Sequence, residues 1–264
     1  MNRFCARRRI TLPRSPPRHR PARCRRPKLD PHRATGALTR GAVAVSEPIV
    51  HQFSLAQLVE KARTLAVPGE RHILGITGAP GTGKSTVAAL VVEALGPDLA
   101  TLVPMDGFHL SNAVLEDLGR RGHKGAHDTF DDFGYAVLLR LLRHQIGTPR
   151  SHTGLPIYAP EFRRDLEESV GSAIPISAAT PLIVTEGNYL LLERNSWPDA
   201  RQMMDEVWFL DLADETRRER LILRHETVGK THAEAELWAW GSDQRNAALI
   251  ESTRDRADFV VRLV

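Results

Sequence analysis

The chain has 264 residues, 42% hydrophobic and 26% charged, which is an ordinary composition for a globular protein. No stretch of about 18 apolar residues occurs, so no membrane span is expected. Of the 36 basic and 32 acidic residues, 13 basic and 1 acidic lie in residues 1–46, which leaves a net charge of −8 for residues 47–264. The overall positive charge is therefore no argument that the folded part binds nucleic acid.

The first 46 residues differ in amino-acid composition from the rest of the chain. Residues 1–46 are rich in arginine, contain six prolines and have no apolar periodicity, so we predict a disordered tail. Three explanations stay open: a start codon assigned too far upstream, a transit peptide, or a nucleic-acid-binding arm. Both cysteines, Cys5 and Cys24, lie in this tail. The predicted domain, residues 47–264, has none, which fits a reducing, cytoplasmic location.

Strand and helix patterns alternate after the tail. In chain order we predict a helix over 54–65, a strand over 72–77, a helix over 84–95, a strand over 101–105, helices over 115–121 and 133–145, strands over 181–186 and 207–211, helices over 214–225 and most of 231–252, and a strand over 259–263. This alternation is typical of an α/β fold in which helices cover both faces of a parallel sheet, that is, three layers. Trp238 and Trp240 are expected to pack in the core.

One motif decides the class of protein. It fits G-x-x-x-x-G-K-[ST] without a gap and stands between a predicted strand and a predicted helix. Glycines let backbone N–H groups wrap a phosphate, and the helix adds its positive N-terminal end. We expect Lys84 to reach the β- and γ-phosphates and Ser85 to bind Mg²⁺. The candidate nucleotide-binding residues are Gly78, Ala79, Pro80, Gly81, Thr82, Gly83, Lys84, Ser85 and Thr86. This P-loop indicates a nucleoside triphosphate as ligand.

Absent motifs narrow the choice among P-loop proteins. No N-K-x-D sequence that would read guanine occurs. The strand where a motor protein would carry D-E ends instead in Glu186-Gly187. A kinase is therefore favoured over a switch-like NTPase or a nucleic-acid-associated NTPase.

Two acids follow predicted strands. The carboxyl ends of parallel strands line the ligand crevice of such sheets, so Asp106 is expected beside the γ-phosphate, as a base for a substrate hydroxyl. A turn-forming aspartate before Gly107 is an equal alternative from position alone. Glu186 ends a buried strand, where an unpaired acid is costly, and we predict that it holds Mg²⁺ through water.

A charged helix predicts a lid over the phosphates. Arg217, Arg220 and Arg224 recur at helical spacing and share a face. Arginines that arrive after ATP binds would neutralise charge on the transferring group, and we assign this role to Arg220 and Arg224. A solvated helix face is the alternative.

Seven segments together resemble one family of kinases. They are GAPGTGKST, PMDGFHLSN, KGAHDTFD, PIYAPEFRRD, TEGNYLLL, RRERLILRH and STRDRADFVV, within residues 55–264. The chain resembles the uridine kinase, phosphoribulokinase and bacterial pantothenate kinase group of P-loop kinases. Within that group it looks most similar to a nucleoside-kinase-like or fructose-transport-kinase-like bacterial branch. The first, second and fifth segments are the most specific in combination.

The resemblance implies further roles. It makes Asp106 the catalytic base, and it identifies the RRERLILRH helix as the lid. Residues implied to contact the substrate are Phe108, His109, Tyr158, Arg163, Asn188 and Tyr189, although Arg164 could replace its neighbour. The expected reaction is phosphorylation of a hydroxyl on a small metabolite by ATP and Mg²⁺. A nucleoside or sugar is favoured as acceptor, pantothenate is the alternative, and a homodimer stays open.

Overall fold

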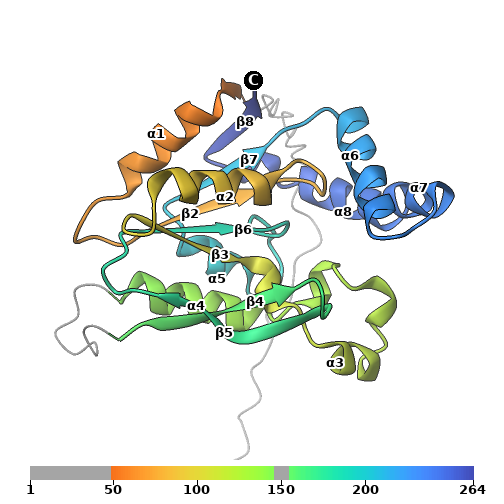
Figure 1. Ribbon diagram of the computed structural model, residues 1–264, viewed down its shortest axis with the longest axis horizontal. Helices are drawn as coiled ribbons and strands as arrows, with labels where there is room; N and C mark the ends of the chain where they lie inside the picture. The colour runs from red at the N-terminus through yellow and green to blue at the C-terminus, as the bar shows by residue number, and fades with distance from the viewer. Residues whose placement is uncertain (1–48, 146–154) are drawn as a thin grey trace, which may run out of the picture. The chain divides into compact units, whose positions relative to one another are not determined.

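The computed structural model describes residues 49–145 and 155–264 (Figure 1), and the predicted tail over residues 1–46 lies outside these ranges. Its main sheet consists of β1 (Val50–Phe53), β2 (His72–Thr77), β3 (Ala100–Pro104), β6 (Leu182–Glu186), β7 (Glu206–Leu210) and β8 (Phe259–Leu263). These strands lie in the order β1-β8-β7-β2-β6-β3, and every neighbouring pair is parallel. The predicted parallel sheet is confirmed.

Helices cover both faces of this sheet. They are α1 (Leu55–Leu65), α2 (Lys84–Leu95), α3 (Asn112–Asp117), α4 (Asp132–Arg143), α5 (Trp197–Gln202), α6 (Asp214–Thr227), α7 (His232–Trp240) and α8 (Ser242–Glu251). Successive side chains of a strand point to opposite faces, so β2 contributes to two cores. Ile73 packs with residues of α4, α5 and α8, whereas Leu74 packs with α1 and α2. The three-layer architecture is thereby confirmed.

A second, two-stranded sheet was not predicted. It is the antiparallel hairpin of β4 (Ile157–Arg163) and β5 (Glu168–Ile176), which lies with α3 and α4 below the main sheet in Figure 1. The hairpin packs on η1 (Met105–Phe108), the 3₁₀ turn that follows β3. A Cβ atom on Gly107 would come within 2.3 Å of the carbonyl oxygen of Pro160, so only glycine permits this close approach.

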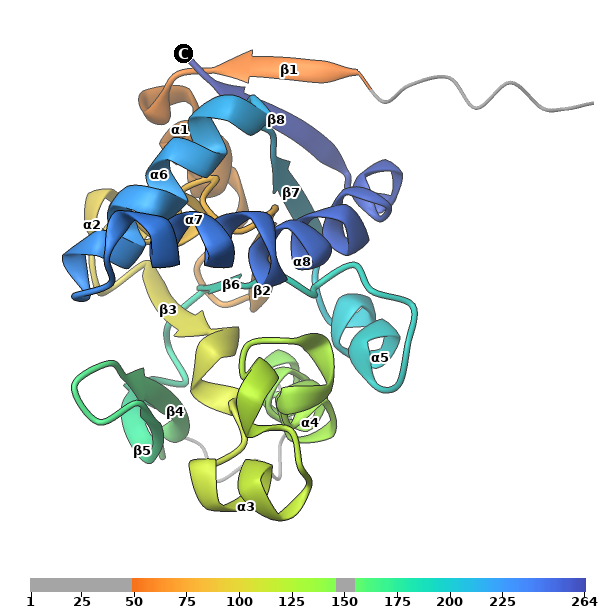
Figure 2. The ribbon, with the colours of Figure 1, turned by 90° about the vertical axis from the view of Figure 1, so that its right-hand side faces the viewer.

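The C-terminal helices correct one prediction. The stretch predicted to be mostly helical over 231–252 forms two helices, α7 and α8, which meet at Gly241, and α7 lies beside α6 (Figure 2). Trp238 and Trp240 are 41% and 58% exposed, so the expectation that they pack in the core was wrong. Their rings instead lie 4.8 Å from the ammonium of Lys230 and 4.4 Å from the guanidinium of Arg218, and cation–π contact holds them at the surface.

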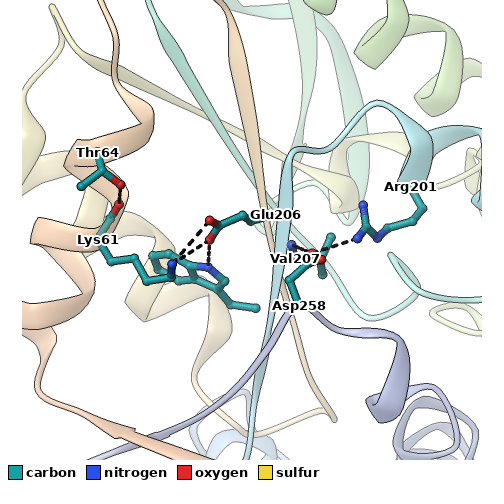
Figure 3. A network of polar contacts seen from close by, with 7 residues as sticks. Lys61, Thr64, Arg201, Glu206, Val207 and Asp258 are labelled. Carbon is teal, nitrogen blue, oxygen red and sulfur yellow. Dashed lines mark hydrogen bonds and ion pairs between the residues drawn. The ribbon is translucent and has the colours of Figure 1, made fainter.

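Polar contacts link the strand β7 to the elements around it (Figure 3). Lys61 of α1 pairs with Glu206 at 3.1 Å, and the indole N–H of Trp208 donates to the same carboxylate at 2.8 Å. Asp258 accepts from the backbone N–H of Val207 at 2.7 Å and from Arg201 at 2.8 Å. These contacts tie α1, α5 and the start of β8 to one strand.

Within residues 49–145 and 155–264, no helix is both long and apolar enough to cross a bilayer.

Candidate active site

Three neighbouring strands bring the predicted site residues to one edge of the sheet. The P-loop follows β2, and Glu186 is the last residue of β6. In the register of the sheet, Glu186 lies beside Ile76 on one side and Pro104 on the other. Asp106 comes two residues after Pro104, within η1. The sequence order P-loop, Asp106, Glu186 thus becomes a spatial cluster at the carboxyl ends of β2, β3 and β6.

The P-loop has the backbone that phosphate binding requires. Gly81 and Gly83 both have φ of +90°, a left-handed conformation that favours glycine. Gly83 is the N-cap of α2, and no side chain caps the first N–H groups of that helix. Uncapped N–H groups at a helix N-terminus form a ready anion site, because they carry partial positive charge.

A cleft of about 220 Å³ opens over this loop. It is lined by Gly81, Gly83, Lys84, Ser85, Thr86, Arg164, Arg220, Leu221 and Arg224. The two arginines that the sequence assigned to the lid therefore do face the P-loop, from α6. Arg164 joins them from the turn of the β4–β5 hairpin.

A larger groove of about 540 Å³ lies elsewhere, between the end of α2, the edge strand β3 and the hairpin. Its lining is mostly apolar, for example Val92, Leu102 and Ile174, and its charged residues are Glu93 and Glu161. Carboxylates repel phosphate, so the smaller cleft is the one suited to a nucleotide.

Burial shapes the charges at the base of the cleft. Glu186 is only 5% exposed, and burial together with the nearby charge of Asp106 raises the pKa of its carboxyl to about 7. Lys84 and a hydrogen bond donated by Ser85, 3.0 Å from Oγ to Oε2, act in the opposite direction. Burial lowers the pKa of Lys84, while Glu186 and Asp106 oppose that shift. One cation and two acids therefore interact here at close range.

The donor set fits magnesium. A hydroxyl oxygen of Ser85 and a carboxylate oxygen of Glu186 meet at 3.0 Å, and both are hard oxygen ligands. Within the part of the chain that the structure describes, no group of three or more His, Cys, Asp and Glu side chains forms a metal cage. Mg²⁺ commonly takes one or two protein ligands and completes its shell with water and substrate phosphates.

His109 is held in a stack of tilted aromatic rings beside the turn that carries Asp106. Its ring centroid lies 4.1 Å from that of Phe130 and 4.7 Å from that of Phe162. Burial lowers the pKa of His109, which favours the neutral ring. Nδ1 lies 2.7 Å from the backbone carbonyl of Asp106, which can only accept, so Nδ1 carries the proton. The stack thereby braces the turn that carries Asp106.

The other residues implied to contact substrate have different surroundings. Phe108 and Tyr189 are core residues, 8% and 1% exposed, and the Tyr189 hydroxyl donates to the carbonyl of Gly125 at 2.7 Å. Asn188 accepts a hydrogen bond from Thr77 through its backbone oxygen, and Tyr158 is 53% exposed on the hairpin. None of the four lines the cleft over the P-loop, so their contact with a substrate stays a prediction.

The two adjacent arginines on the hairpin have different surroundings. Arg163, the residue selected from the sequence, pairs with Asp165 at 2.9 Å and does not line the cleft. Arg164 lines the cleft. Arg163 is the last residue of β4 and Arg164 stands in the turn that follows, so the difference depends on a turn conformation that the R-R pair in the sequence does not reveal.

Arg217 shares a predicted face with Arg220 and Arg224 but is structural. It is 1% exposed and donates to Asp214 at 3.2 Å, to the carbonyl of Pro80 at 3.3 Å and to Gln244 at 2.7 Å. It therefore joins α6 to the P-loop and to α8.

Replacing Arg217 with methionine is expected to lower the free energy of unfolding by about 2–3 kcal/mol, because buried acceptors lose a charged donor. Urea unfolding measures this loss. Arg218→Met on the same helix is the matched control, since its more exposed pair with Asp214 contributes less than about 1 kcal/mol. Equal losses in the two variants would contradict the anchoring role.

Comparison with known proteins decides the family. No family model matches the chain. Protein C227.14 of Schizosaccharomyces pombe, named as a candidate uridine kinase, is 30% identical over 234 residues, which cover 84% of this chain and 94% of that protein. The chain belongs to the uridine-kinase-like family of P-loop kinases.

Two further relatives of this kinase agree. The ATP-dependent kinase YFH7 of Zygosaccharomyces rouxii is 27% identical over 222 residues, covering 74% of this chain and 59% of that protein. The crystal structure of a candidate fructose transport system kinase from Silicibacter sp. TM1040 is 33% identical, with a TM-score of 0.67, and covers 79% of this chain and 98% of that one. The resemblance found from the sequence motifs is confirmed, and the chain is an ATP-dependent kinase.

Proposed function

We propose that this kinase transfers the γ-phosphoryl group of ATP, in the presence of Mg²⁺, to a hydroxyl group of an uncharged small metabolite, a nucleoside or a free sugar. The names of two relatives, one called a uridine kinase and the other a fructose transport system kinase, support this class of acceptor. The observation that carries the proposal is the position of Asp106. Asp106 lies in η1, two residues after Pro104, which pairs with Glu186 in the sheet, so it stands at the same edge of the sheet as the P-loop.

In the proposed phosphoryl transfer, each of these residues has a separate role. Backbone N–H groups of the P-loop and the Lys84 ammonium bind the phosphates, and Arg220 and Arg224 neutralise charge from the other side of the cleft. Ser85 and Glu186 would hold Mg²⁺, which supplies charge neutralisation between phosphate oxygens. Asp106 accepts the proton of the acceptor hydroxyl as the oxygen–phosphorus bond forms.

Two cations near the proposed acceptor site, Lys124 and Arg120, are already engaged in hydrogen bonds, which favours an uncharged acceptor over a phosphorylated sugar or the carboxylate of pantothenate. Lys124 donates to Asn112 at 2.7 Å and to the carbonyl of Glu167 at 2.6 Å. Arg120 donates to the carbonyl of Asp128 at 2.7 Å. These side chains hold loops together, so binding an acidic acceptor would require them to break existing hydrogen bonds.

The test measures ADP release from ATP and Mg²⁺ with nucleosides, free sugars, sugar phosphates and pantothenate as acceptors. We expect release that depends on an uncharged acceptor and falls at least about 100-fold in Asp106→Asn, because a base in the transition state contributes about that much. Asp117→Asn, an exposed acid at the end of α3, is the control and keeps its activity. ADP release that ignores every acceptor and survives Asp106→Asn would instead favour a switch-like NTPase.

A further inference from the structure

Three arginines converge on the phosphate cleft from two separate parts of the chain. Arg220 and Arg224 come from α6, which packs against the P-loop. Arg164 comes from the β4–β5 hairpin, as the first residue after β4.

Their ion pairing separates these three arginines from their neighbours. Arg163 pairs with Asp165, and Arg217 and Arg218 both pair with Asp214. Among the described residues, no acid lies within ion-pairing distance of Arg164, Arg220 or Arg224. A guanidinium without a carboxylate, close to a phosphate-binding loop, keeps its donors available for an anionic ligand.

The hairpin that carries Arg164 is fixed against the turn of Asp106. Pro160 of the hairpin lies against Gly107, and Ser169 donates to the carbonyl of His109 at 3.1 Å. The Phe162 ring contacts the His109 ring at a tilt, with 4.7 Å between the ring centroids. The position of the hairpin backbone that carries Arg164 is therefore set by contacts with the turn that carries the proposed base. An arginine placed in this way links the acceptor side of the site to the donor phosphates.

We propose that Arg164 is a catalytic residue that binds the γ-phosphate of ATP and remains on the phosphoryl group during transfer. In that step the bond from the γ-phosphorus to the β–γ bridging oxygen breaks, the bond to the acceptor oxygen forms, and the hydroxyl proton passes to Asp106. Arg164 donates to the non-bridging oxygens of the moving group. The γ-phosphate of the donor is favoured over a phosphate on the acceptor, because the other residues of the cleft belong to the P-loop and α6. This inference rests on the proposed function.

The first experiment needs no acceptor. Dissociation constants for ADP and for a non-hydrolysable ATP analogue, each with Mg²⁺, are measured on the full chain as wild type, Arg164→Ala, Arg164→Lys and Arg163→Ala. We expect Arg164→Ala to weaken the analogue about 10-fold, in line with one charged hydrogen-bonding contact, and to leave ADP within about twofold. Arg164→Lys recovers part of the loss, since lysine keeps the charge without the two-pronged geometry. Arg163→Ala changes neither constant.

Three results would overturn the assignment: equal weakening of ADP and the analogue, no weakening of either, or the same loss in Arg163→Ala. Thermal unfolding of each variant shows whether a loss follows from misfolding, and Arg164→Lys supplies a folded comparison if the alanine variant is unstable. With an active acceptor, kcat is expected to fall about 100-fold in Arg164→Ala. A loss confined to the KM of a phosphorylated acceptor would contradict the donor-side role. Failure of Asp106→Asn to reduce activity would overturn the proposed function and leave the binding result standing.

Discussion

Replacing Lys84 with methionine is expected to lower kcat/KM for ATP about 1000-fold, because a preorganised cation at the transferring phosphates is among the largest contributions to catalysis. Methionine keeps much of the length of the side chain and removes the charge. Lys84 lies in the cleft, where Glu186 and Asp106 favour its charged form against the effect of burial. Steady-state ADP release at several ATP concentrations measures the change.

Lys230→Met provides the comparison for Lys84→Met. The ammonium of Lys230 lies 4.8 Å from the Trp238 ring and does not line the cleft, so its loss should leave kcat/KM within about twofold, as surface substitutions generally do. If Lys84→Met retained a tenth or more of the wild-type value, ATP would not be held by the P-loop in the way we describe.

Glu186→Gln is expected to separate stability from activity. Mg²⁺-dependent turnover should fall about 1000-fold, because the carboxylate oxygen proposed to hold the metal is lost. The variant should nevertheless be the more stable protein at pH 8. The pKa of Glu186 is raised to about 7 in the folded chain from its ordinary 4.5, so the wild type loses stability as the pH rises between these values. Glutamine removes that dependence.

Urea unfolding without Mg²⁺ at pH 5 and pH 8 tests the sign. The advantage of Glu186→Gln over the wild type should grow by on the order of 2 kcal/mol between the two pH values, as expected for a raised carboxyl pKa. Glu93→Gln, an exposed acid at the end of α2, should show no such growth. A Glu186→Gln variant that loses stability equally at both pH values would show that the carboxylate is not destabilised by burial.

Much of the fold and part of the site could be predicted because their signals are local. The P-loop is a contiguous motif, and Glu186 and Asp106 follow strands whose buried apolar runs are easy to recognise. The order of strands in a parallel sheet then brings these residues together without any knowledge of side-chain packing. Helical spacing grouped Arg217, Arg220 and Arg224 on one face of α6, and of these Arg220 and Arg224 line the cleft, while their role as a lid stays a prediction.

The hairpin and its arginine could not be predicted in the same way. Pro160 and Pro175 interrupt β4 and β5, and a register shift lies between Ala159 and Glu161, so no clean alternation marks these strands. β1 is only four residues long, and α5 only six, which leaves little periodicity to detect. The choice between Arg163 and Arg164 depends on the turn conformation. Trp238 and Trp240 were misjudged because their partners are cations from elsewhere on the chain.

The separate sheet of β4 and β5 has a consequence for how such an enzyme can change its substrate. Among residues 49–145 and 155–264 the hairpin shares no strand pairing with the six-stranded sheet, and its Pro160 lies against the glycine-containing turn at Gly107. The hairpin could therefore be remodelled without disturbing the pairing of the strands that carry the P-loop and Glu186. A grafted hairpin would have to satisfy two requirements: a backbone that tolerates the close approach to Gly107, and a guanidinium at the position of Arg164.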